Sequence, residues 1–410
     1  MPADVRRGLP RRQTSEELGL RPWSGLWPRV LYVGDVPVES TYHGSALLHR
    51  LLENYPSERL TILETGTPSQ VERRIPGAGY CTYRLDASRW LKTRFHPYAV
   101  VWFTYRGSSR ATQMDANEFD CILTVAHGFG WLAAANIARR CEVPLHLIIH
   151  DDWPRAAQVP AAFRNWFDYQ FAKVYRQAQS RLCVSPSMES AYHARYGAAG
   201  TVLYPMRAAT APEFTQPPTR LANNDHPFTV AFAGTINSPG YVQSLITLHD
   251  ALARIGGRLL IFGPLTPNQA QQNGLDLPNI TICGLLPSPE LMNRLRDEAD
   301  ALFVPMSFDA AERSNMEMSF PSKLVDYTAV GVPLLIYGPP YCSAVDWAKQ
   351  NAGVAEVVEI ENELDEAVRR LATDPMRRLK LGAAALATGK QYFAHHTVQE
   401  VFNRAITSRG

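Results

Sequence analysis

The residues with the clearest chemistry lie in one short segment near the end of the chain, 319–337. Within it, Ser322, Lys323 and Asp326 follow one another over little more than one helical turn. Pro321-Ser322 is a typical helix start, because a Ser hydroxyl can accept hydrogen bonds from exposed backbone N–H groups. A helix start beside a Lys suits a phosphate, and a carboxylate about 6 Å further along the axis suits the hydroxyls of a sugar. The segment therefore predicts a site for a nucleotide-type ligand.

The residues that follow indicate where this helix should stop. Gly331 accepts the left-handed conformation that ends helices, and Pro333 prevents the helix from continuing. The apolar run Leu334-Leu335-Ile336 then predicts a buried strand.

The length, composition and net charge of the chain limit the classes of protein to which it can belong. A chain of 410 residues exceeds one ordinary core, so two domains are expected, and 46% apolar residues is normal for a globular protein. The net charge of +2 is too small to suggest a nucleic-acid partner. No run approaches the ~20 apolar residues that span a bilayer, so we expect a cytoplasmic protein with at most peripheral membrane contact.

The six cysteines are scattered and include no C-x-x-C pair, which favours buried free thiols in a reducing compartment over a zinc site. Neither half carries a G-x-G-x-x-G or a Walker A sequence, so the sequence does not favour a dinucleotide cofactor or ATP hydrolysis. We expect no cofactor and no bound metal.

Buried apolar runs alternate with helical stretches along both halves of the chain, which favours parallel sheets covered by helices on both faces. Residues 207–226, rich in Ala, Thr, Pro and Asn, interrupt this pattern and form the best linker. One apolar run of the first half, 98–103, is expected to be a strand like its neighbours. The fold class is therefore α/β, with two Rossmann-like doubly wound domains facing each other across a cleft. Their expected bounds are 1–28 for a flexible N-terminal arm, 29–210 for the first domain, 211–390 for the second, and 391–410 for a helix returning to the first.

The second half predicts where a ligand should bind. Its expected strands end at Gly234, Gly263, Gly284 and Pro305. Ligands of open α/β sheets bind beyond the carboxyl ends of the strands, and glycines there let a ligand approach the backbone.

These residues carry a family resemblance. The second half resembles the nucleotide-sugar domain of GT-B glycosyltransferases, and it is most similar to the retaining family 4. The resemblance rests on five motifs in order: Phe232-Ala233-Gly234-Thr235, Leu260-Ile261-Phe262-Gly263, Ile282-Cys283-Gly284-Leu285-Leu286, the run from Pro289-Glu290-Leu291 to Pro305, and the run from Pro321 to Pro333.

The resemblance implies a glycosyltransferase that uses a nucleoside-diphosphate sugar, with retention at the anomeric carbon and no obligatory metal. It implies a carbohydrate, lipid-linked or small-molecule acceptor, and a role in surface polysaccharide or glycoconjugate synthesis. The implied donor-binding residues are Gly234, Thr235, Gly263, Gly284, Leu285, Ser322, Lys323 and Asp326. The implied acceptor-binding residues are Tyr42, His43 and Gly44, and the candidate catalytic residues are His127, His150 and Asp151.

The chain departs from the family pattern at two places. Family members often have two acidic residues eight positions apart, but here Met318 precedes Asp326 at that spacing, with Glu317 beside it. The loop 234–239 lacks the cations that the family often carries, so Lys323 or Arg313 must supply the positive charge for a diphosphate. Weaker candidates for sugar or acceptor contact are Glu312, Glu317, Asp35 and Glu39.

Two other functions stay open. A sugar-nucleotide epimerase or a phosphorylase could share the two-domain plan, although the chain gives no context for the pyridoxal phosphate of large phosphorylases. A non-catalytic sugar-nucleotide-binding subunit is the alternative from another class, favoured by Met318 and by the loop without cations.

Overall fold

The computed structural model describes residues 27–40, 43–83, 95, 98–99, 102, 118–157, 159–236 and 238–407. The expected N-terminal arm, 1–28, lies outside this range apart from its last two residues. Those two are tied to the first domain, because Tyr55 donates a hydrogen bond to the Pro28 carbonyl and its ring packs on Trp27 at 5.0 Å.

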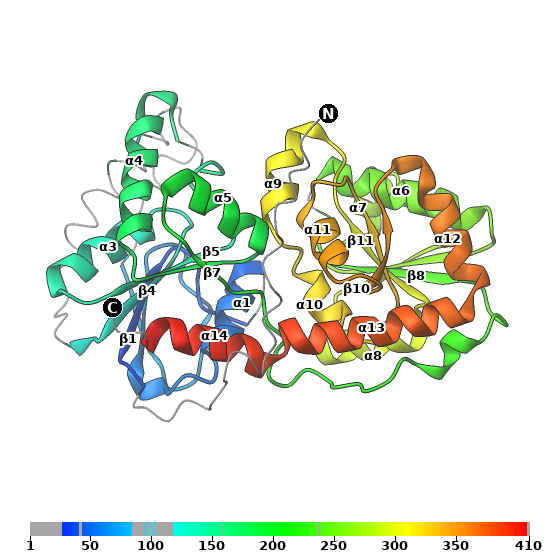
Figure 1. Ribbon diagram of the computed structural model, residues 1–410, viewed down its shortest axis with the longest axis horizontal. Helices are drawn as coiled ribbons and strands as arrows, with labels where there is room; N and C mark the ends of the chain where they lie inside the picture. Colours follow the sequence, from blue (N-terminus) through cyan, green and yellow to red (C-terminus); the bar gives the residue numbers. More distant parts are fainter. Residues whose placement is uncertain are drawn as a thin grey trace, which may run out of the picture.

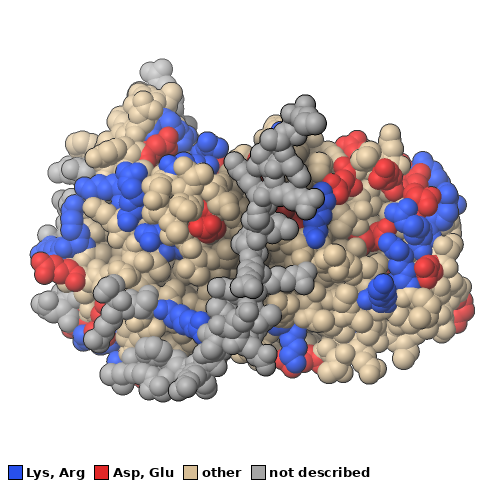
Figure 2. Space-filling view, in the orientation of Figure 1, with Lys and Arg blue, Asp and Glu red and all other residues tan. Residues whose placement is uncertain are grey.

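The described residues form two lobes, each built on a parallel sheet between helices (Figure 1). The predicted α/β class with two doubly wound domains is confirmed. Basic and acidic side chains are interspersed over both lobes on the face shown in Figure 2. Among the described residues, no helix is both long and apolar enough to cross a bilayer.

The first sheet has seven strands in the order β3-β2-β1-β4-β5-β6-β7. Its central strands are fully buried and almost entirely apolar, with Thr124 and His146 as the polar exceptions in β4 and β5, as expected for strands covered on both faces. Its strands are β1 (Val30–Gly34), β2 (Leu60–Glu64), β3 (Gly79–Thr82), β4 (Cys121–Val125), β5 (Leu145–Ile149), β6 (Ser180–Cys183) and β7 (Thr201–Val202). Its helices are α1 (His43–Leu52), α3 (Gly130–Cys141), α4 (Ala161–Gln177) and α5 (Pro186–Tyr196).

Alternate residues of each strand serve the two faces of this sheet. In β1, Leu31 and Val33 pack toward the layer that contains α3, α4 and α5. Val30 and Tyr32 pack on the other face, toward α1 and the last helix, α14 (His395–Thr407). Val398 and Phe402 of α14 are buried there, so the end of the chain completes the core of the first lobe.

The second sheet has six strands in the order β10-β9-β8-β11-β12-β13. This order reverses direction between β8 and β11, which makes the carboxyl ends of these two strands the switch point where ligands bind in such sheets. Its strands are β8 (Thr229–Ala233), β9 (Arg258–Phe262), β10 (Ile280–Gly284), β11 (Ala301–Pro305), β12 (Leu334–Tyr337) and β13 (Ala355–Val358). Its helices are α6 (Pro239–Ala253), α7 (Pro267–Gln272), α8 (Ser288–Glu298), α9 (Arg313–Met318), α10 (Lys323–Tyr327), α11 (Ser343–Gln350), α12 (Leu364–Thr373) and α13 (Pro375–Phe393).

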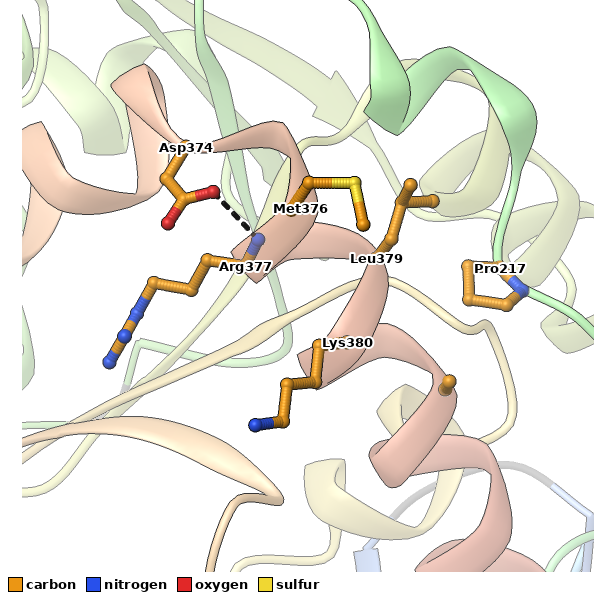
Figure 3. Close-up of a pocket in the computed structure, with 7 residues that line it drawn as sticks. Pro217, Asp374, Met376, Arg377, Leu379 and Lys380 are labelled. Atoms are coloured by element: carbon orange, nitrogen blue, oxygen red, sulfur yellow. Dashed lines mark hydrogen bonds between the residues drawn. The ribbon is translucent and has the colours of Figure 1, made fainter.

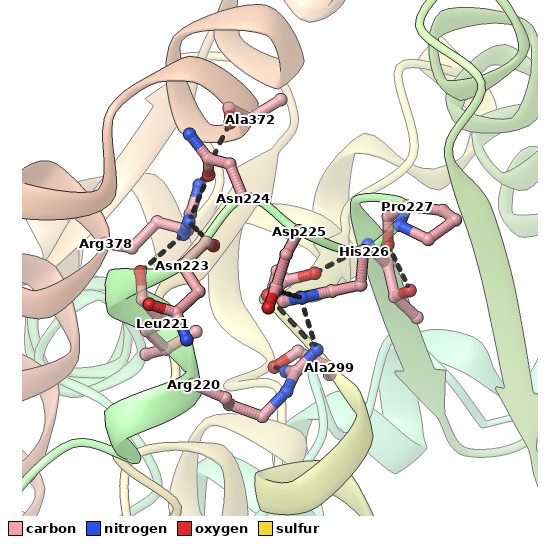
Figure 4. Close-up of polar contacts among 12 residues, drawn as sticks. Arg220, Leu221, Asn223, Asn224, Asp225, His226, Pro227, Ala299, Ala372 and Arg378 are labelled. Carbon is pink, nitrogen blue, oxygen red and sulfur yellow. Dashed lines mark hydrogen bonds and ion pairs between the residues drawn. The ribbon is translucent and has the colours of Figure 1, made fainter.

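The linker is fastened to the second lobe over much of its length (Figure 4). Arg378 of α13 is 1% exposed, and it donates hydrogen bonds to the carbonyls of Leu221 and Asn223 and to the Asn224 side chain. Arg220 bonds back to the Ala299 carbonyl and pairs with Asp300. Arg296 also donates to the Gln216 carbonyl, and Arg207 donates to the Val325 carbonyl, so the earlier part of the linker contacts the second lobe as well.

One sequence expectation is wrong in the first lobe. The run 98–103 was expected to form a strand, but its described residues Tyr98, Ala99 and Trp102 are helical. Tyr98 and Trp102 are 47% and 59% exposed, so apolar composition here does not reflect a buried strand.

Candidate functional site

Lys323 occupies the switch point of the second sheet. Its side chain extends from the start of α10 to the end of β8, where a Cβ added to Gly234 would lie 2.5 Å from Lys323 Cε. The ammonium lies 5.0 Å from the Phe232 ring centroid and 5.2 Å from that of Tyr241. Burial lowers the pKa of Lys323 to about 8. No carboxylate among the described residues pairs with this ammonium, which leaves it available to an anion.

Glycines make room for this lysine and for a ligand beside it. Gly234 has φ +148°, and Gly263, at the end of β9, has φ +150°; both conformations strain any residue with a side chain. A Cβ on Gly263 would collide with the Gly234 carbonyl oxygen. Gly284 (φ +76°) has open space around it, and Leu285 next to it is 59% exposed. The three predicted glycines thus lie along the carboxyl edge of the second sheet.

The start of α10 differs from the expected helix. Ser322 is exposed, and its side chain makes no capping hydrogen bond, so the prediction that it caps the helix is wrong. The helix is only five residues long, and the chain then continues through turns to Gly331 at φ +78°. The regular bonding pattern stops at Val325, because the Ala329 N–H bonds to Asp326 O and Arg207 Nε donates to Val325 O. A helix this short provides little dipole, so the charge for an anion must come from Lys323 itself.

Asp326 lies one turn after Lys323 and faces the first lobe. Its Oδ1 is 3.5 Å from Nη1 of Arg50, near the end of α1, and has no hydrogen-bond partner of good geometry among the described residues. Arg207, from the linker, lies close enough for the Asp326 charge to oppose the effect of burial, which lowers the Arg207 pKa to about 10. Sequence reasoning missed both arginines, because neither belongs to a motif. Thr235 is half-buried in the loop after Gly234.

The histidines of the first lobe lie at the equivalent switch point, between β1 and β4 and at the end of β5. His127 follows β4, and its ring centroid is 5.4 Å from that of Trp153. Burial lowers the pKa of His150, the nearby His127 acts in the same direction, and Asp151 opposes them. A Cβ on Gly44, at the start of α1, would lie 4.0 Å from His150 Nδ1. The structure thus brings His127, His150 and Gly44 together.

The remaining first-lobe candidates do not share one environment. Asp151 is exposed next to His150. Tyr42 lies outside the described residues, and His43 is described only by its place at the start of α1. Asp35 caps α3: its Oδ2 accepts from the backbone N–H groups of Phe129 and Gly130. This role accounts for Asp35 without a ligand.

Asp152, rather than its neighbour Asp151, is the buried acid of this region. Its Oδ1 accepts a hydrogen bond from Arg195 Nη1 at 2.8 Å, and its Oδ2 accepts one from the Ser314 hydroxyl at 2.9 Å. Ser314 belongs to α9 of the second lobe, which packs on α5 of the first (Figure 1). Asp152 therefore connects the lobes on the side of the cleft formed by α5 and α9.

Met318 belongs to the same contact. Its carbonyl accepts a hydrogen bond from the Ser185 hydroxyl of the first lobe, and its side chain is buried with Sδ 4.0 Å from Arg195 Nη2. The place where family members often have an acid is thus packed between the lobes.

Two hollows on the second lobe lie away from these residues. One, of about 700 Å³, is a shallow depression beside α13, lined by Met376, Leu379 and Pro217 (Figure 3). The other, of about 230 Å³, lies under the linker next to Phe228 and Asp300, which precede β8 and β11. Both are remote from the carboxyl ends of the strands, so neither is the candidate site.

The comparisons with known proteins agree on the architecture. The sequence matches no protein-family model and no curated protein. Anabaena HepE, solved in complex with UDP and glucose, superposes with a TM-score of 0.64 over 93% of this chain and 100% of its own, at 14% identity. Sucrose-phosphate synthase from Thermosynechococcus elongatus superposes at 0.63 over 92% and 97% of the two chains, at 16% identity. WaaG, a glycosyltransferase involved in lipopolysaccharide biosynthesis, superposes at 0.60 over 93% and 100%, at 13% identity.

This chain has the GT-B fold. The superpositions cover nearly the whole of each GT-B protein, so both lobes take part in the shared fold. Lys323 and Asp326 lie at the switch point of the second sheet, and His127 and His150 lie at that of the first.

Proposed function

We propose that this GT-B protein is a glycosyltransferase that moves a sugar from a nucleoside-diphosphate sugar to a hydroxyl acceptor. The observation that carries the proposal is the placement of Lys323 against Gly234 at the switch point of the second sheet, with Asp326 one turn away. An unpaired ammonium next to glycine-only backbone suits a diphosphate, and a carboxylate one turn further suits ribose hydroxyls.

Catalysis would depend on positioning and on stabilising the leaving diphosphate. Lys323 supplies positive charge where the bond to the sugar breaks, which is the role that a divalent cation plays in other phosphate sites. We therefore propose transfer without a bound metal, and retention of configuration by family resemblance. His127 and His150, at the switch point of the first sheet, would contact the acceptor hydroxyl or the transferred sugar. Burial lowers the pKa of His150, which favours the neutral imidazole, the form that can accept a proton.

The structural neighbours suggest which donors to try first. HepE was solved with UDP-glucose, and WaaG is described as a lipopolysaccharide enzyme. These similarities favour a uridine nucleotide, a hexose and a cytoplasmic role in surface polysaccharide or glycoconjugate synthesis.

The direct test follows nucleoside diphosphate release from a panel of UDP- and GDP-sugars, with and without sugar acceptors. Acceptor-dependent release from at least one donor is expected. Binding of a donor without any release would refute an enzyme and favour a sugar-nucleotide-binding subunit, whereas conversion of the sugar without an acceptor would favour an epimerase.

A pair of variants tests the donor site itself. Asp326→Ala should weaken UDP or GDP binding at least tenfold, because a carboxylate bonded to ligand hydroxyls contributes roughly 1.5–3 kcal/mol. Asp297→Ala removes an exposed carboxylate on α8 and should leave affinity unchanged. Equal affinities of the two variants would refute the ribose role of Asp326.

A further inference from the structure

Glu312 has a buried carboxylate oxygen with no partner in the part of the chain that the structure describes. The residue ends a short 3₁₀ turn, Ala310–Glu312, in the segment between β11 and α9. Its Oε2 is shielded from solvent and has no hydrogen-bond partner among the described residues. Leaving a buried acceptor unsatisfied costs free energy, about 1–3 kcal/mol and more for a charged group. A carboxylate held in this state indicates that something outside the protein supplies the donor.

The surroundings of Glu312 place it at the switch point. A Cβ added to Gly240, in the first turn of α6, would lie 2.9 Å from Glu312 Oε2 and would collide with the Ser307 hydroxyl. Ser307 lies two residues after the end of β11, and α6 begins in the loop after β8. Glu312 thus reaches the space between the two strands where the sheet order reverses. The start of α6, a helix of 15 residues, favours a negative charge there.

Tyr241 connects Glu312 to the lysine of the proposed donor site. Its ring is 5.2 Å from Lys323 Nζ, and the Glu312 charge adds to the effect of burial in raising its pKa to about 12. The second lobe therefore has three charged groups around the switch point: the Asp326 carboxylate, the Lys323 ammonium and the Glu312 carboxylate. Two hydrogen-bond acceptors and one cation suit the ribose, the hexose and the diphosphate of a nucleoside-diphosphate sugar.

We propose that Glu312 accepts hydrogen bonds from hydroxyls of the donor's hexose and excludes sugars that carry a carboxylate of their own. The proposal rests on the proposed function and extends it to the class of sugar. An ionised carboxylate has only acceptor capacity, so it binds the O–H groups of a neutral hexose and repels a uronic acid. Met318 cannot serve this purpose, because it is packed against Arg195 between the lobes.

The experiment measures how much tighter a nucleotide-sugar binds than the nucleotide alone, and how each variant changes this difference. Calorimetry on the full chain would measure binding of UDP, UDP-glucose and UDP-glucuronate, and of GDP and GDP-mannose, to the wild type, Glu312→Gln and Glu312→Asp. UDP or GDP affinity should stay within twofold in both variants. The matching neutral nucleotide-sugar should bind the variants about tenfold more weakly, because charge-assisted hydrogen bonds are lost or misplaced. UDP-glucuronate should bind the wild type no better than UDP.

Glu366→Gln is the matched control, since Glu366 lies on α12 of the same lobe, is 59% exposed and, among the described residues, pairs only with Arg369 and Arg370 of its own helix. It should bind every probe like the wild type. Unchanged sugar-nucleotide affinity in Glu312→Gln, with UDP or GDP binding intact, would overturn the role of Glu312 alone. A wild type that binds neither UDP nor GDP would overturn the proposed function together with it.

Discussion

Arg50 of the first lobe and Asp326 of the second form an ion pair across the cleft, with 3.5 Å between Nη1 and Oδ1. The carboxylate proposed for ribose is therefore attracted to the opposite lobe when no donor is bound. Both side chains are mostly buried, at 18% and 25% exposure. Ribose hydroxyls would have to compete with Arg50 for the same oxygen atoms.

Replacing Arg50 should therefore strengthen nucleotide binding. Arg50→Gln is expected to raise UDP affinity roughly threefold, since a partly exposed ion pair contributes up to about 1 kcal/mol. Arg29→Gln removes another arginine of the first lobe, in an exposed pair with Asp120, and should leave UDP affinity unchanged. Calorimetry decides the matter: weaker UDP binding by Arg50→Gln would mean that Arg50 contacts the nucleotide instead of competing with it.

Lys323 should make nucleotide binding and stability respond to pH in opposite directions. Its folded-state pKa of about 8 lies below the ordinary value of 10.5, so the ammonium loses its charge as pH rises through 8, and UDP affinity should fall. The unfolded chain holds this proton up to about pH 10.5, so the stabilising contribution of the group rises between pH 8 and 10.5. Urea unfolding and UDP titrations of the wild type and Lys323→Gln from pH 7 to 10 measure both trends. The same pH dependence in both proteins would contradict the prediction.

We predict that Gly234 is needed to leave room for the Lys323 side chain, and not only to permit the positive φ of the backbone. In Gly234→Ala the new Cβ meets Lys323 Cε, so UDP affinity should fall at least tenfold. Gly256→Ala is the matched control, because Gly256 also has positive φ (+67°) but has nothing within 4 Å of an added Cβ. Both variants should lose roughly 1–2 kcal/mol of stability through strain, and only the first should lose affinity. Equal UDP affinities of Gly234→Ala and Gly256→Ala would show that Gly234 only permits the backbone conformation and is not needed to make room for Lys323.

Asp152 should contribute far more to stability than an exposed aspartate in a similar pair. Asp152→Ala leaves Arg195 without its partner in a buried place and should cost about 3–5 kcal/mol in urea unfolding. Asp120→Ala breaks the exposed pair with Arg29 and should cost no more than about 1 kcal/mol. Ser314→Ala removes only the bond between the lobes, at roughly 0.5–1.5 kcal/mol. A loss for Asp152→Ala no larger than that for Asp120→Ala would show that the pair with Arg195 contributes no more than an exposed pair.

Much of the second lobe could be predicted from sequence, because its signals are local. Strands that end in glycine at Gly234, Gly263 and Gly284 are apolar runs followed by a residue that permits positive φ, and the structure has them there. The position of Lys323 beside Gly234 was not predictable from either segment alone. It depends on the crossover that brings α10 next to β8, nearly ninety residues earlier in the chain.

The predictions from sequence that were wrong or incomplete share one physical cause: tertiary contacts decided the outcome at those residues. Ser322 has a typical capping sequence, yet its side chain makes no capping bond, and α10 ends where Arg207 bonds to the Val325 carbonyl. Asp152 and Asp151 are equivalent in sequence, and only the positions of Arg195 and Ser314 decide which is buried. Arg50 and Tyr241 carry no motif and became candidates through distances alone.

The placement of α14 has a consequence for how the protein is made. Val398 and Phe402 fill the core beneath the first sheet, although they are synthesised after the entire second lobe. Domains ordinarily fold in order as the chain leaves the ribosome. Here the first lobe leaves the ribosome with one side of its core exposed, and it stays incomplete until α14 has emerged. Premature termination anywhere in the second half would therefore damage the first.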